Sequence, residues 1–427
     1  MVYIQSDSEF ELEASKWTNY HTFLTAFSAL VTFFGLFSIV FTGLCFNRMA
    51  ISFGWDSADT LIIFAIISIS GLFSVLPRYF ADRFGRKPLI IILNNIFLIL
   101  IIGSTLAPET ISFMIFRFFA GLFGVNIASV MISEEVPARH RGRALGAATG
   151  IGMTSSLLAA YLYTFTGQSE DMWRYLYAIV CIIGMILITI LWFKIKETKR
   201  FAHIKAKGKE YLNSSLLSVF HKKYLKILVL SSLVLLLTNW IYMTIKRYFV
   251  FFLTEERGSL GFNEEVIGTW MIFIYVGSIL GYYFSGYFAD LIGRKKTIYI
   301  TVCTYFIGSV IFLYTWEIWL IFMGLFILNI SFAIYRMIAD ILAVEFFPTE
   351  LRSSGSGWII AFASISSIVG NFIMYFIVES LGEWGLSFFI VGTICLIALV
   401  IVTLFIPETK QRVVEEIYLT EIEKLEV

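Results

Sequence analysis

The sequence has 427 residues, of which 58% are hydrophobic, 17% are aromatic and only 15% are charged. So few polar side chains cannot cover a soluble globule of this length, and lipid must therefore solvate most of the chain. The formal net charge of +1 argues against a nucleic-acid partner, because such binding requires a basic excess concentrated on one face.

The first 22 residues precede any apolar stretch. They contain four acidic residues and a single lysine, Lys16, which is the reverse of the basic start of a secretory signal. We therefore expect residues 1–22 to form a cytoplasmic amino-terminal segment and the first apolar stretch to be retained.

Twelve apolar stretches follow, each near the roughly 20 residues that a helix needs to cross a bilayer. They are predicted at 23–46, 58–77, 88–107, 111–133, 144–166, 173–193, 225–253, 266–288, 297–315, 318–344, 355–378 and 386–406. An even number of spans places both termini on the same side. The sequence thus predicts an all-α, multi-pass integral membrane protein.

The distribution of Lys and Arg sets the orientation, because cytoplasmic loops retain these residues. With the amino terminus inside, the predicted cytoplasmic loops contain 24 of them, whereas the outside loops contain only Arg48 and Arg257, with Arg174 at a helix edge. Nine lie in the polar stretch that separates six spans from six, which we interpret as a cytoplasmic linker at 194–224. We expect a plasma-membrane protein with both termini in the cytoplasm, including a tail at 407–427.

A repeat relates the two halves at 23–193 and 225–406. Eight residues recur without a gap 211 positions later: Glu134, Pro137, Arg141, Gly146, Trp173, Glu197, Thr198 and Lys199 match Glu345, Pro348, Arg352, Gly357, Trp384, Glu408, Thr409 and Lys410. Such a match predicts duplicated units. Two pseudo-symmetric six-helix bundles around a central pathway are what alternating access requires, since one half can rock against the other about a fixed site.

The charged octet "ADRFGRKP" at 81–88 also recurs, as "ADLIGRKK" at 289–296. With the repeat, these octets make the chain resemble the major facilitator superfamily, and within it the sugar-porter-related branch, whose loop signature runs G-x-x-x-D-R-x-G-R-K. The first copy has Arg78 in place of the glycine, followed by Asp82, Arg83, Gly85, Arg86 and Lys87. The second has Gly286, Asp290, Gly293, Arg294 and Lys295, with Leu291 in place of the arginine. The missing glycine is expected to loosen helix packing in the amino-terminal half.

The resemblance implies a gating role for these charges. In similar transporters they hold the halves together when the cytoplasmic side is closed, and the pairs Glu134–Arg141 and Glu345–Arg352 would join them, as would Glu197 and Glu408 of the repeated "ETK". The alternative is that these cations only fix the topology.

Charged residues deeper in the spans are costly and usually face a partner or a water-filled cavity. Four cations and one acid qualify, and these are Arg117, Lys246, Arg247, Arg336 and Asp340. Arg336 and Asp340 can pair on one helix face, either as a static pair or as a proton-coupling group. Neighbouring Lys246 and Arg247 point about 100° apart, so at most one faces the pathway squarely and the other can snorkel.

The resemblance also identifies Arg117 as the span-four arginine that answers a buried span-one aspartate in proton-coupled sugar porters. In "GLFSIVFTG", 35–43, Phe37 occupies the position of that aspartate. Three explanations stay open: transport is uniport, another carboxylate titrates, or a bound anion neutralises Arg117.

Spans one, four, seven and ten line the cavity in the superfamily, which suggests polar and aromatic solute contacts on them. The candidates are Asn126, Asn239, Trp240, Tyr242, Asn329 and Tyr335. Each could instead bond only to a neighbouring helix.

No catalytic set, nucleotide motif or metal-ligand cluster is visible, and the four cysteines are too widely spaced for a disulfide framework, so we expect neither an enzyme nor a cofactor. We predict a monomeric secondary active or facilitative transporter for a small polar metabolite, either a sugar or an organic anion, acting as a symporter if protons are coupled. The alternatives are a drug exporter, favoured by the aromatic content, and a non-transporting sensor on the carrier fold.

Overall fold

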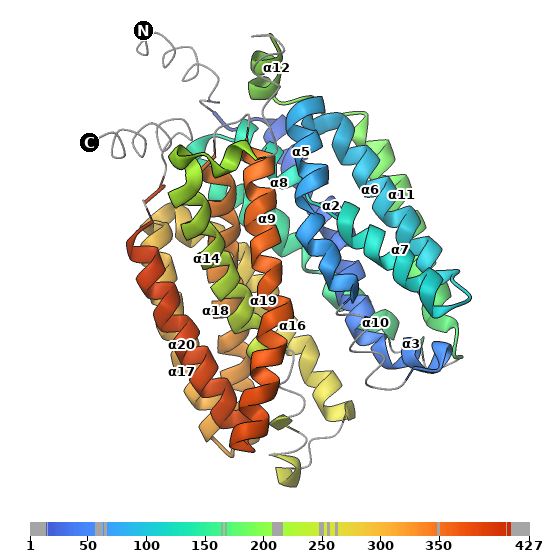
Figure 1. Cartoon of the computed structure of the whole chain (residues 1–427), viewed down its shortest axis with the longest axis vertical. Helices are drawn as coiled ribbons and strands as arrows, with labels where there is room; N and C mark the ends of the chain where they lie inside the picture. Colours follow the sequence, from blue (N-terminus) through green and yellow to red (C-terminus); the bar gives the residue numbers. More distant parts are fainter. Residues whose placement is uncertain are drawn as a thin grey trace.

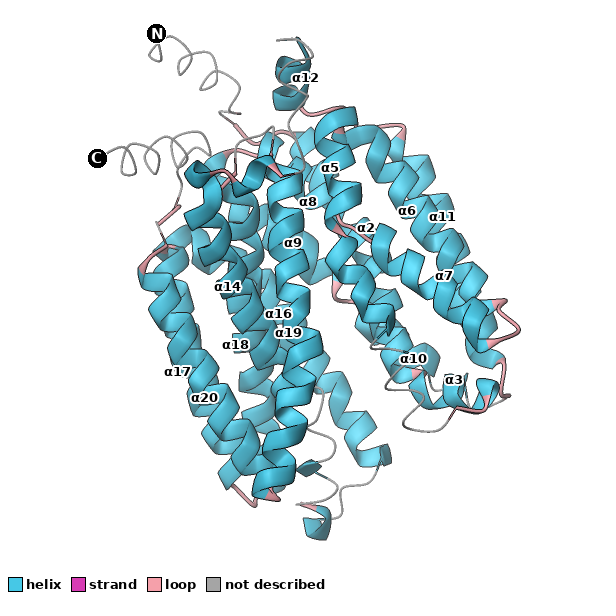
Figure 2. Cartoon of the chain, viewed as in Figure 1, coloured by secondary structure: helices cyan, strands magenta, loops and turns pink. Residues whose placement is uncertain are grey.

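The computed structural model describes residues 14, 16–55, 63, 66–163, 165–166, 169–206, 217–246, 252–253, 257–260, 264–347, 351–406 and 408–410. Within these ranges every regular element is a helix (Figure 2). Ten described helical segments are long and apolar enough to cross a bilayer. A further helix, α19 (Arg352–Leu381), is 30 residues long.

The first bundle is built from the amino-terminal half (Figure 1). Its elements are α2 (Asn19–Leu44), α3 (Phe46–Phe53), η1 (Ile69–Phe73), α5 (Val75–Phe84), α6 (Arg86–Thr105), α7 (Thr110–Phe123), α8 (Ala128–Glu135), η2 (Ala138–His140), α9 (Arg141–Gly152), α10 (Ser155–Tyr163) and α11 (Met172–Trp192). Between α5 and α6 the chain turns at Gly85, whose φ of 104° is open to glycine and strained for other residues. This turn places Arg86 at the start of α6.

The second bundle repeats this plan. After α12 (Lys199–Ala206) and η4 (Ser218–Phe220) come α14 (Lys222–Lys246), η6 (Gly258–Leu260), α16 (Glu264–Ile292), α17 (Arg294–Tyr314), α18 (Ile318–Glu345), α19 and α20 (Trp384–Leu404). Gly293, with a φ of 103°, makes the turn between α16 and α17 and places Arg294 at the start of α17.

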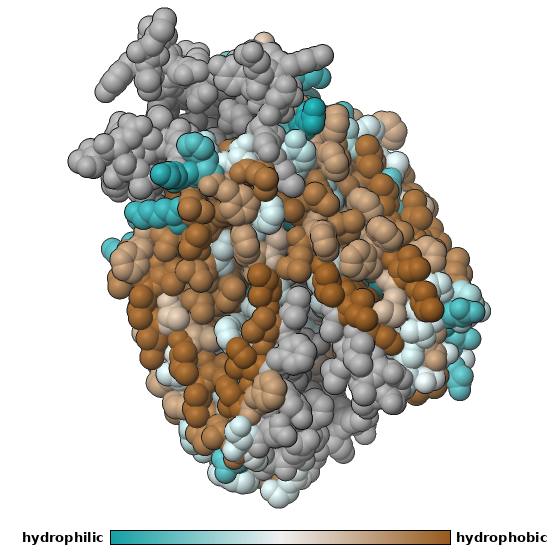
Figure 3. All heavy atoms as spheres, viewed as in Figure 1, coloured by the Kyte–Doolittle hydropathy of each residue, from teal (hydrophilic) through white to brown (hydrophobic). Residues whose placement is uncertain are grey.

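Each bundle has its own hydrophobic core, while large apolar side chains also cover the outside. Phe27, Trp173 and Tyr177 are buried in the first core. In contrast, residues such as Ile190 and Ile397 are more than half exposed. Figure 3 shows hydrophobic residues along the flanks and hydrophilic residues gathered toward the two ends. This pattern suits a bilayer, where lipid solvates the flanks.

Several predicted spans are not single helices. Span four is broken at residues 124–127 between α7 and α8, and span five at residues 153–154 between α9 and α10. Non-helical backbone is tolerated at membrane depth where it is buried in protein, and Gly124 favours the break. Span seven is helical through Lys246, and residues 247–251 at its predicted outer end lie outside the described residues, as do residues 58–62, 64 and 65 of span two.

The two bundles meet along two seams where α9 packs against α16 and α5 packs against α19. In the first seam a Cβ atom at Gly146 would lie 2.9 Å from the backbone nitrogen of Gly286. In the second, a Cβ atom at Gly357 would lie 3.0 Å from the Cα atom of Val75. Small residues thus bring the helix backbones of opposite halves close together.

Candidate functional site

The predicted charges of the first loop form a buried cluster at the end of the amino-terminal bundle. The Arg86 guanidinium lies at the start of α6, with Nη2 3.2 Å from Asp82 Oδ1 and 3.0 Å from Glu134 Oε1. The Thr198 hydroxyl donates a 2.6 Å hydrogen bond to Glu134 Oε2. One arginine therefore joins α5, α6 and α8, while Thr198 attaches the first residues of the linker.

The carboxyl-terminal bundle repeats this cluster with matching atoms. Arg294 Nη1 lies 3.3 Å from Asp290 Oδ1, and its Nη2 lies 3.0 Å from Glu345 Oε1. Thr409 donates to Glu345 Oε2 at 2.6 Å. The sequence repeat therefore extends to the arrangement of the side chains.

The glutamates of the repeated "ETK" bind the starts of two helices. Glu197 accepts hydrogen bonds from the backbone nitrogens of Arg86 and Lys87, at 3.1 and 3.2 Å. Glu408 does the same for Arg294 and Lys295, at 2.9 and 3.1 Å. These backbone groups have no partner inside the helix, and the positive end of the helix dipole favours a carboxylate there.

Two ion pairs join the halves, and here the predicted pairing is wrong. Arg352 Nη1 lies 3.1 Å from Glu134 Oε1, and Arg141 Nη1 lies 3.6 Å from Glu345 Oε1. Each glutamate is thus paired with the arginine of the opposite half, because the starts of α9 and α19 reach across the seams. Sequence offset alone could not distinguish pairing within a half from pairing between halves.

The two loop aspartates also reach across. Asp82 accepts hydrogen bonds from the backbone nitrogens of Ser353 and Ser354, at 3.2 and 2.7 Å, and from the Ser354 hydroxyl at 2.7 Å. Asp290 accepts from the backbone nitrogen of Arg143 at 2.9 Å. Each aspartate therefore binds the first turn of a helix from the other half, where the helix dipole favours an anion.

We call this set the cytoplasmic latch, after the side on which the sequence predicts it. Its members are Asp82, Arg86, Glu134, Arg141, Asp290, Arg294, Glu345 and Arg352, all of them buried. Asp82 lies beyond the second predicted span, and burial raises the pKa of its carboxyl to about 6, although Arg86 and hydrogen bonds from Ser354 and Ser353 lower it. Because the latch ties both seams, the two halves are closed against each other at this end of the molecule.

The other predicted gating residues lie at the rim of the latch. Arg83 is exposed, and so is Leu291, which replaces the second signature arginine. Lys295 Nζ donates to the carbonyl oxygen of Leu404 at 3.1 Å. Lys87 Nζ lies 5.1 Å from the centre of the Trp192 ring.

Arg117 lies in α7 and is only 5% exposed. Its Nη1 donates to the Thr42 hydroxyl at 2.9 Å and to the Tyr177 hydroxyl at 3.0 Å. Its Nε and Nη2 are buried without a hydrogen-bond partner, and no carboxylate of the described chain forms an ion pair with it. Its Cζ also lies 5.2 Å from the centre of the Phe113 ring and 4.8 Å from that of the Tyr177 ring. These hydroxyls and rings offset only part of the cost of burying the guanidinium, because none of them carries a negative charge.

Phe37 explains why Arg117 lacks an acid. The phenyl ring is fully buried, stacks on Phe41 with ring centres 5.1 Å apart, and meets the Tyr177 ring edge-on at 5.8 Å. An aromatic cluster therefore fills the space where the resemblance places a proton-carrying aspartate.

In the second bundle Arg336 and Asp340 form the predicted pair on α18. Arg336 Nε and Nη2 each lie 3.1 Å from an Asp340 oxygen, and Nη1 donates to Asn239 Oδ1 of α14. Both side chains are partly exposed. Trp240 packs against Gly370, where a Cβ atom would lie 3.2 Å from its ring.

The remaining candidates are not gathered around one site. Asn126 lies in the break between α7 and α8 and donates to Thr32 at 3.0 Å, while its Oδ1 accepts no hydrogen bond from the part of the chain that the structure describes. Asn329 lies between α18 and α16, where it accepts from Ser278 at 3.2 Å, and Tyr335 is fully buried in the second core. The side chains of Tyr242 and Lys246, and Arg247 as a whole, lie outside the described residues.

Sequence reasoning misplaced the consequence of Arg78. The matching glycine, Gly286, packs against Gly142 and Gly146 of the opposite half, so the glycine serves the seam between halves and not packing within one half. The Arg78 stem fills the equivalent place, because a Cβ atom at Gly357 would lie 3.1 Å from Arg78 Cδ. The sequence showed that Arg78 replaces the signature glycine, but only the fold shows that this position lies in the seam between the halves.

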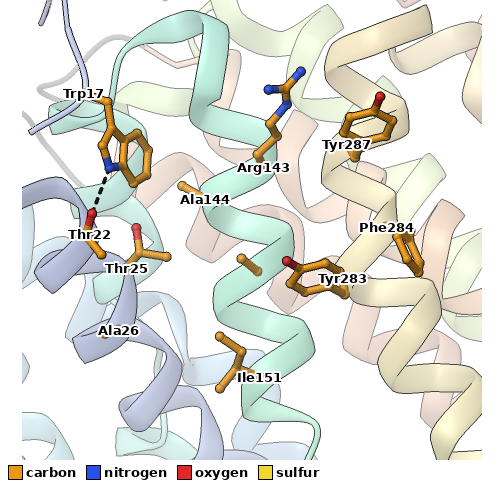
Figure 4. A pocket seen from close by; sticks show the side chains of 11 residues that line it. Trp17, Thr22, Thr25, Ala26, Arg143, Ala144, Ile151, Tyr283, Phe284 and Tyr287 are labelled. Atoms are coloured by element: carbon orange, nitrogen blue, oxygen red, sulfur yellow. Dashed lines mark hydrogen bonds between the residues drawn. The ribbon is translucent and has the colours of Figure 1, made fainter.

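A groove of about 390 Å³ opens beside the first seam, between α2, α9 and α16. Figure 4 shows Trp17 and Thr25 on one side of α9, with Tyr283 and Phe284 on the other. None of the predicted site residues lines this groove, so it is distinct from the charged interior.

Comparison with known proteins places the chain. The family model of the Major Facilitator Superfamily matches residues 22–258 and 235–421. The chain is 27% identical over 383 residues to a cis,cis-muconate transport protein of Acinetobacter baylyi, covering 85% of this chain and 87% of that one. It is 28% identical over 338 residues to the sialic acid transporter NanX of Escherichia coli, covering 75% and 78%.

Among solved structures, the proton:xylose symporter XylE of Escherichia coli matches with a TM-score of 0.77 at 19% identity, over 95% of this chain and 99% of that one. At this identity the likeness speaks for the fold alone, which is the predicted arrangement of twelve helices in two bundles. The chain therefore belongs to the major facilitator superfamily.

Proposed function

We propose that this chain carries a small organic anion, a carboxylate, across the plasma membrane by alternating access, with both termini in the cytoplasm. That it is a transporter of a small metabolite follows from its family and its relatives. The choice of an anion rests on one observation: the buried guanidinium of Arg117 has no carboxylate partner among the described residues.

The chemistry of the site supports this substrate class. A carboxylate can accept two parallel hydrogen bonds from a guanidinium, and Arg117 has two nitrogens without partners, Nε and Nη2. Thr42 and Tyr177 supply hydroxyl groups beside it. Two relatives are named for cis,cis-muconate and for sialic acid, and both of these compounds are carboxylates.

The observed conformation supplies one half of the transport cycle. With the cytoplasmic latch closed, we propose that the anion reaches Arg117 from the outside. Release to the cytoplasm requires that Arg352 leave Glu134 and Arg141 leave Glu345, together with the two aspartate contacts at the starts of α9 and α19. Substrate binding and latch opening are then alternate steps of one cycle.

Proton coupling, if it operates, requires an acid other than the missing span-one aspartate. Asp340 is the candidate, because its side chain is partly exposed and it lies deep in the second bundle. Replacing it, Asp340→Asn, then abolishes accumulation driven by a pH gradient but preserves exchange of solute for solute. Accumulation that persists in Asp340→Asn excludes this residue as the proton carrier.

A sugar is the second candidate, and Asn126 favours it. This amide lies at the interruption of span four, where broken helices often mark binding sites, and its Oδ1 has no partner among the described residues. A neutral polyol could donate a hydrogen bond to that oxygen.

Transport by purified protein in vesicles distinguishes these substrates. We expect counterflow of radiolabelled cis,cis-muconate by the wild type, loss of that counterflow in Arg117→Gln, and little rescue by Arg117→Lys, because lysine cannot donate bidentately. The exposed Arg139, which is not among the predicted site residues, supplies the matched control for losing one cation, Arg139→Gln. Counterflow of xylose but of no carboxylate, or full activity in Arg117→Gln, would overturn the proposal.

A further inference from the structure

The groove beside the first seam is charged at one end and apolar along the rest of its length. Arg143 occupies the end nearest the latch, two positions after Arg141. From there the groove follows α9 as far as Ile151, which is a rise of about 12 Å along the helix. Its volume of about 390 Å³ is in the range of sites that bind small molecules.

Aromatic rings form the two sides of this groove, and small side chains leave room between them (Figure 4). Trp17 stands on the side of the first half, while Tyr283 and Tyr287 of α16 stand on the side of the second. The residues that leave room are alanines of α2 and α9, namely Ala26, Ala144 and Ala147. A channel of this composition suits an extended hydrocarbon chain.

The groove opens on the flank of the molecule and not into the transport pathway. At this end the interior is closed by the buried pair of Arg141 and Glu345, whereas Arg143 is exposed. Farther along the groove, Ile151 and Tyr283 are 49% and 51% exposed. Exposed apolar side chains within a membrane span are solvated by lipid, so lipid is the molecule that this groove meets.

Arg143 presents a guanidinium with available donors at the charged end. Its side chain is 42% exposed, its Nε lies 4.0 Å from Asp290 Oδ2, and its Cζ lies 5.2 Å from the centre of the Tyr287 ring. Its Nη1 and Nη2 donate no hydrogen bond to the part of the chain that the structure describes. A guanidinium with free donors can bind a phosphate through two parallel hydrogen bonds.

We propose that this groove binds one anionic phospholipid, with its phosphate on Arg143 and one acyl chain lying along α9 toward Ile151. The site is charged at the end of a span and apolar toward its middle, which is the order of the parts of a lipid in a bilayer. Trp17 and Tyr287 flank the headgroup end, where amphipathic rings are enriched in membrane proteins. Since α2 and α9 belong to one half and α16 to the other, the lipid contacts both halves.

Native mass spectrometry of the purified full-length chain measures this binding. The probes are phosphatidylglycerol, which is anionic, and phosphatidylcholine, which is zwitterionic, with identical acyl chains. Each is titrated separately against protein from which copurified lipid has been removed. The parent should bind one phosphatidylglycerol roughly fivefold more tightly than phosphatidylcholine, which is the increment typical of one arginine near an anionic headgroup.

Two variants separate the headgroup from the chain. Arg143→Gln should remove the preference for phosphatidylglycerol, and because Arg143 is exposed, this variant should fold as the parent does. Ala147→Leu places a larger side chain in the groove and should weaken the binding of both lipids by about tenfold, the loss of about two buried methylene groups. Lys296→Gln removes an exposed cation at the same end of the molecule and should leave both affinities within about twofold.

Quenching of tryptophan fluorescence locates the bound chain. Phosphatidylglycerol brominated on its acyl chains should quench the parent more than it quenches Trp17→Phe, and this difference should disappear when Ala147→Leu is added. Equal affinity of the parent for the two lipids, or an unchanged preference in Arg143→Gln, would overturn the proposal. Parent-like binding by Ala147→Leu, or quenching that is independent of Trp17, would show that the lipid lies elsewhere and would overturn it equally.

Discussion

Neutralising Glu134 is the sharpest perturbation of the cytoplasmic latch. Its carboxylate is fully buried and serves two arginines, with Arg86 at 3.0 Å in its own half and Arg352 at 3.1 Å in the other. Glu134→Gln preserves the shape of the side chain but removes the negative charge that faces Arg352 across the seam. Because the contact with Arg352 exists only while the halves meet, its loss should favour the open conformation.

The size of the effect follows from the contacts. Removing one partner of a buried ion pair costs about 3–5 kcal/mol. Arg86 keeps Asp82 as a partner at 3.2 Å, so part of that cost is shared by both conformations. We assign about 2–3 kcal/mol to the closed conformation alone, which corresponds to a roughly 30- to 150-fold rise in the ratio of open to closed molecules.

Cysteine labelling measures this ratio. Ser356 of α19 is 2% exposed and lies near the latch, so Ser356→Cys should react with an impermeant maleimide from the cytoplasmic face only during opening. The exposed Cys303 is replaced by Ser in this background. We expect labelling of Glu134→Gln to be faster by the same roughly 30- to 150-fold.

The neighbouring acid provides a matched control. Glu135 is also buried, but it accepts a hydrogen bond from the backbone nitrogen of Lys199, within its own half. Glu135→Gln should change the labelling rate by less than about threefold, because a hydrogen bond within one half is present in both the open and the closed conformation and its loss destabilises both. Equal rates in Glu134→Gln and the parent, or equal acceleration in both variants, would refute the assignment of the ion pair to the closed conformation.

Three further predictions concern the seam, pH and the span-one position. Gly286→Ala places a methyl group against the carbonyl oxygen of Gly142 and should destabilise the closed conformation by about 1–3 kcal/mol. Labelling of Ser356→Cys should then be faster, and labelling at the parent rate would contradict the close contact. The closed conformation raises the pKa of Asp82 to about 6, while the solvated carboxyl in the open conformation should titrate near its ordinary value of about 4. The closed conformation therefore binds the proton more tightly than the open one, and lowering the pH from about 7 to about 4.5 should shift molecules toward the closed conformation. The same pH change should slow labelling of the parent more than labelling of Asp82→Asn. Phe37→Asp should supply the missing acid beside Arg117 and abolish carboxylate counterflow. Phe37→Asn, which adds polarity without charge, should retain more of that counterflow. Preserved counterflow in Phe37→Asp would contradict the role of Arg117 as the partner of the transported anion.

The membrane spans could be predicted from the sequence because their signal is local. A run of about 20 apolar residues has few alternatives to a spanning helix. The breaks at residues 124–127 and 153–154 carried only weak signals in the sequence, because a glycine such as Gly124 also occurs at helix crossings within an unbroken span. The latch residues could be identified from the sequence because a duplicated charged octet has no role in lipid.

The partners of those residues were not predictable, because they depend on how the halves meet. The offset of 211 relates Glu134 to Glu345 and Arg141 to Arg352, and it is equally compatible with pairs inside each half and pairs across the seams. Arg78 shows the same limit, since its replacement of a glycine was visible in the sequence but its position against Gly357 was not. Contacts between distant segments require the assembled fold.

The most direct test of the account is the distance between spin labels at Arg139→Cys and Lys296→Cys, recorded with and without cis,cis-muconate. These positions are exposed, and they lie on opposite halves at the end of the molecule that holds the latch. The account predicts one short distance when the latch is closed, a second and longer distance whose population changes on adding the carboxylate, and no such response in Arg117→Gln. A single distance under all conditions, or a response that Arg117→Gln retains in full, would contradict it.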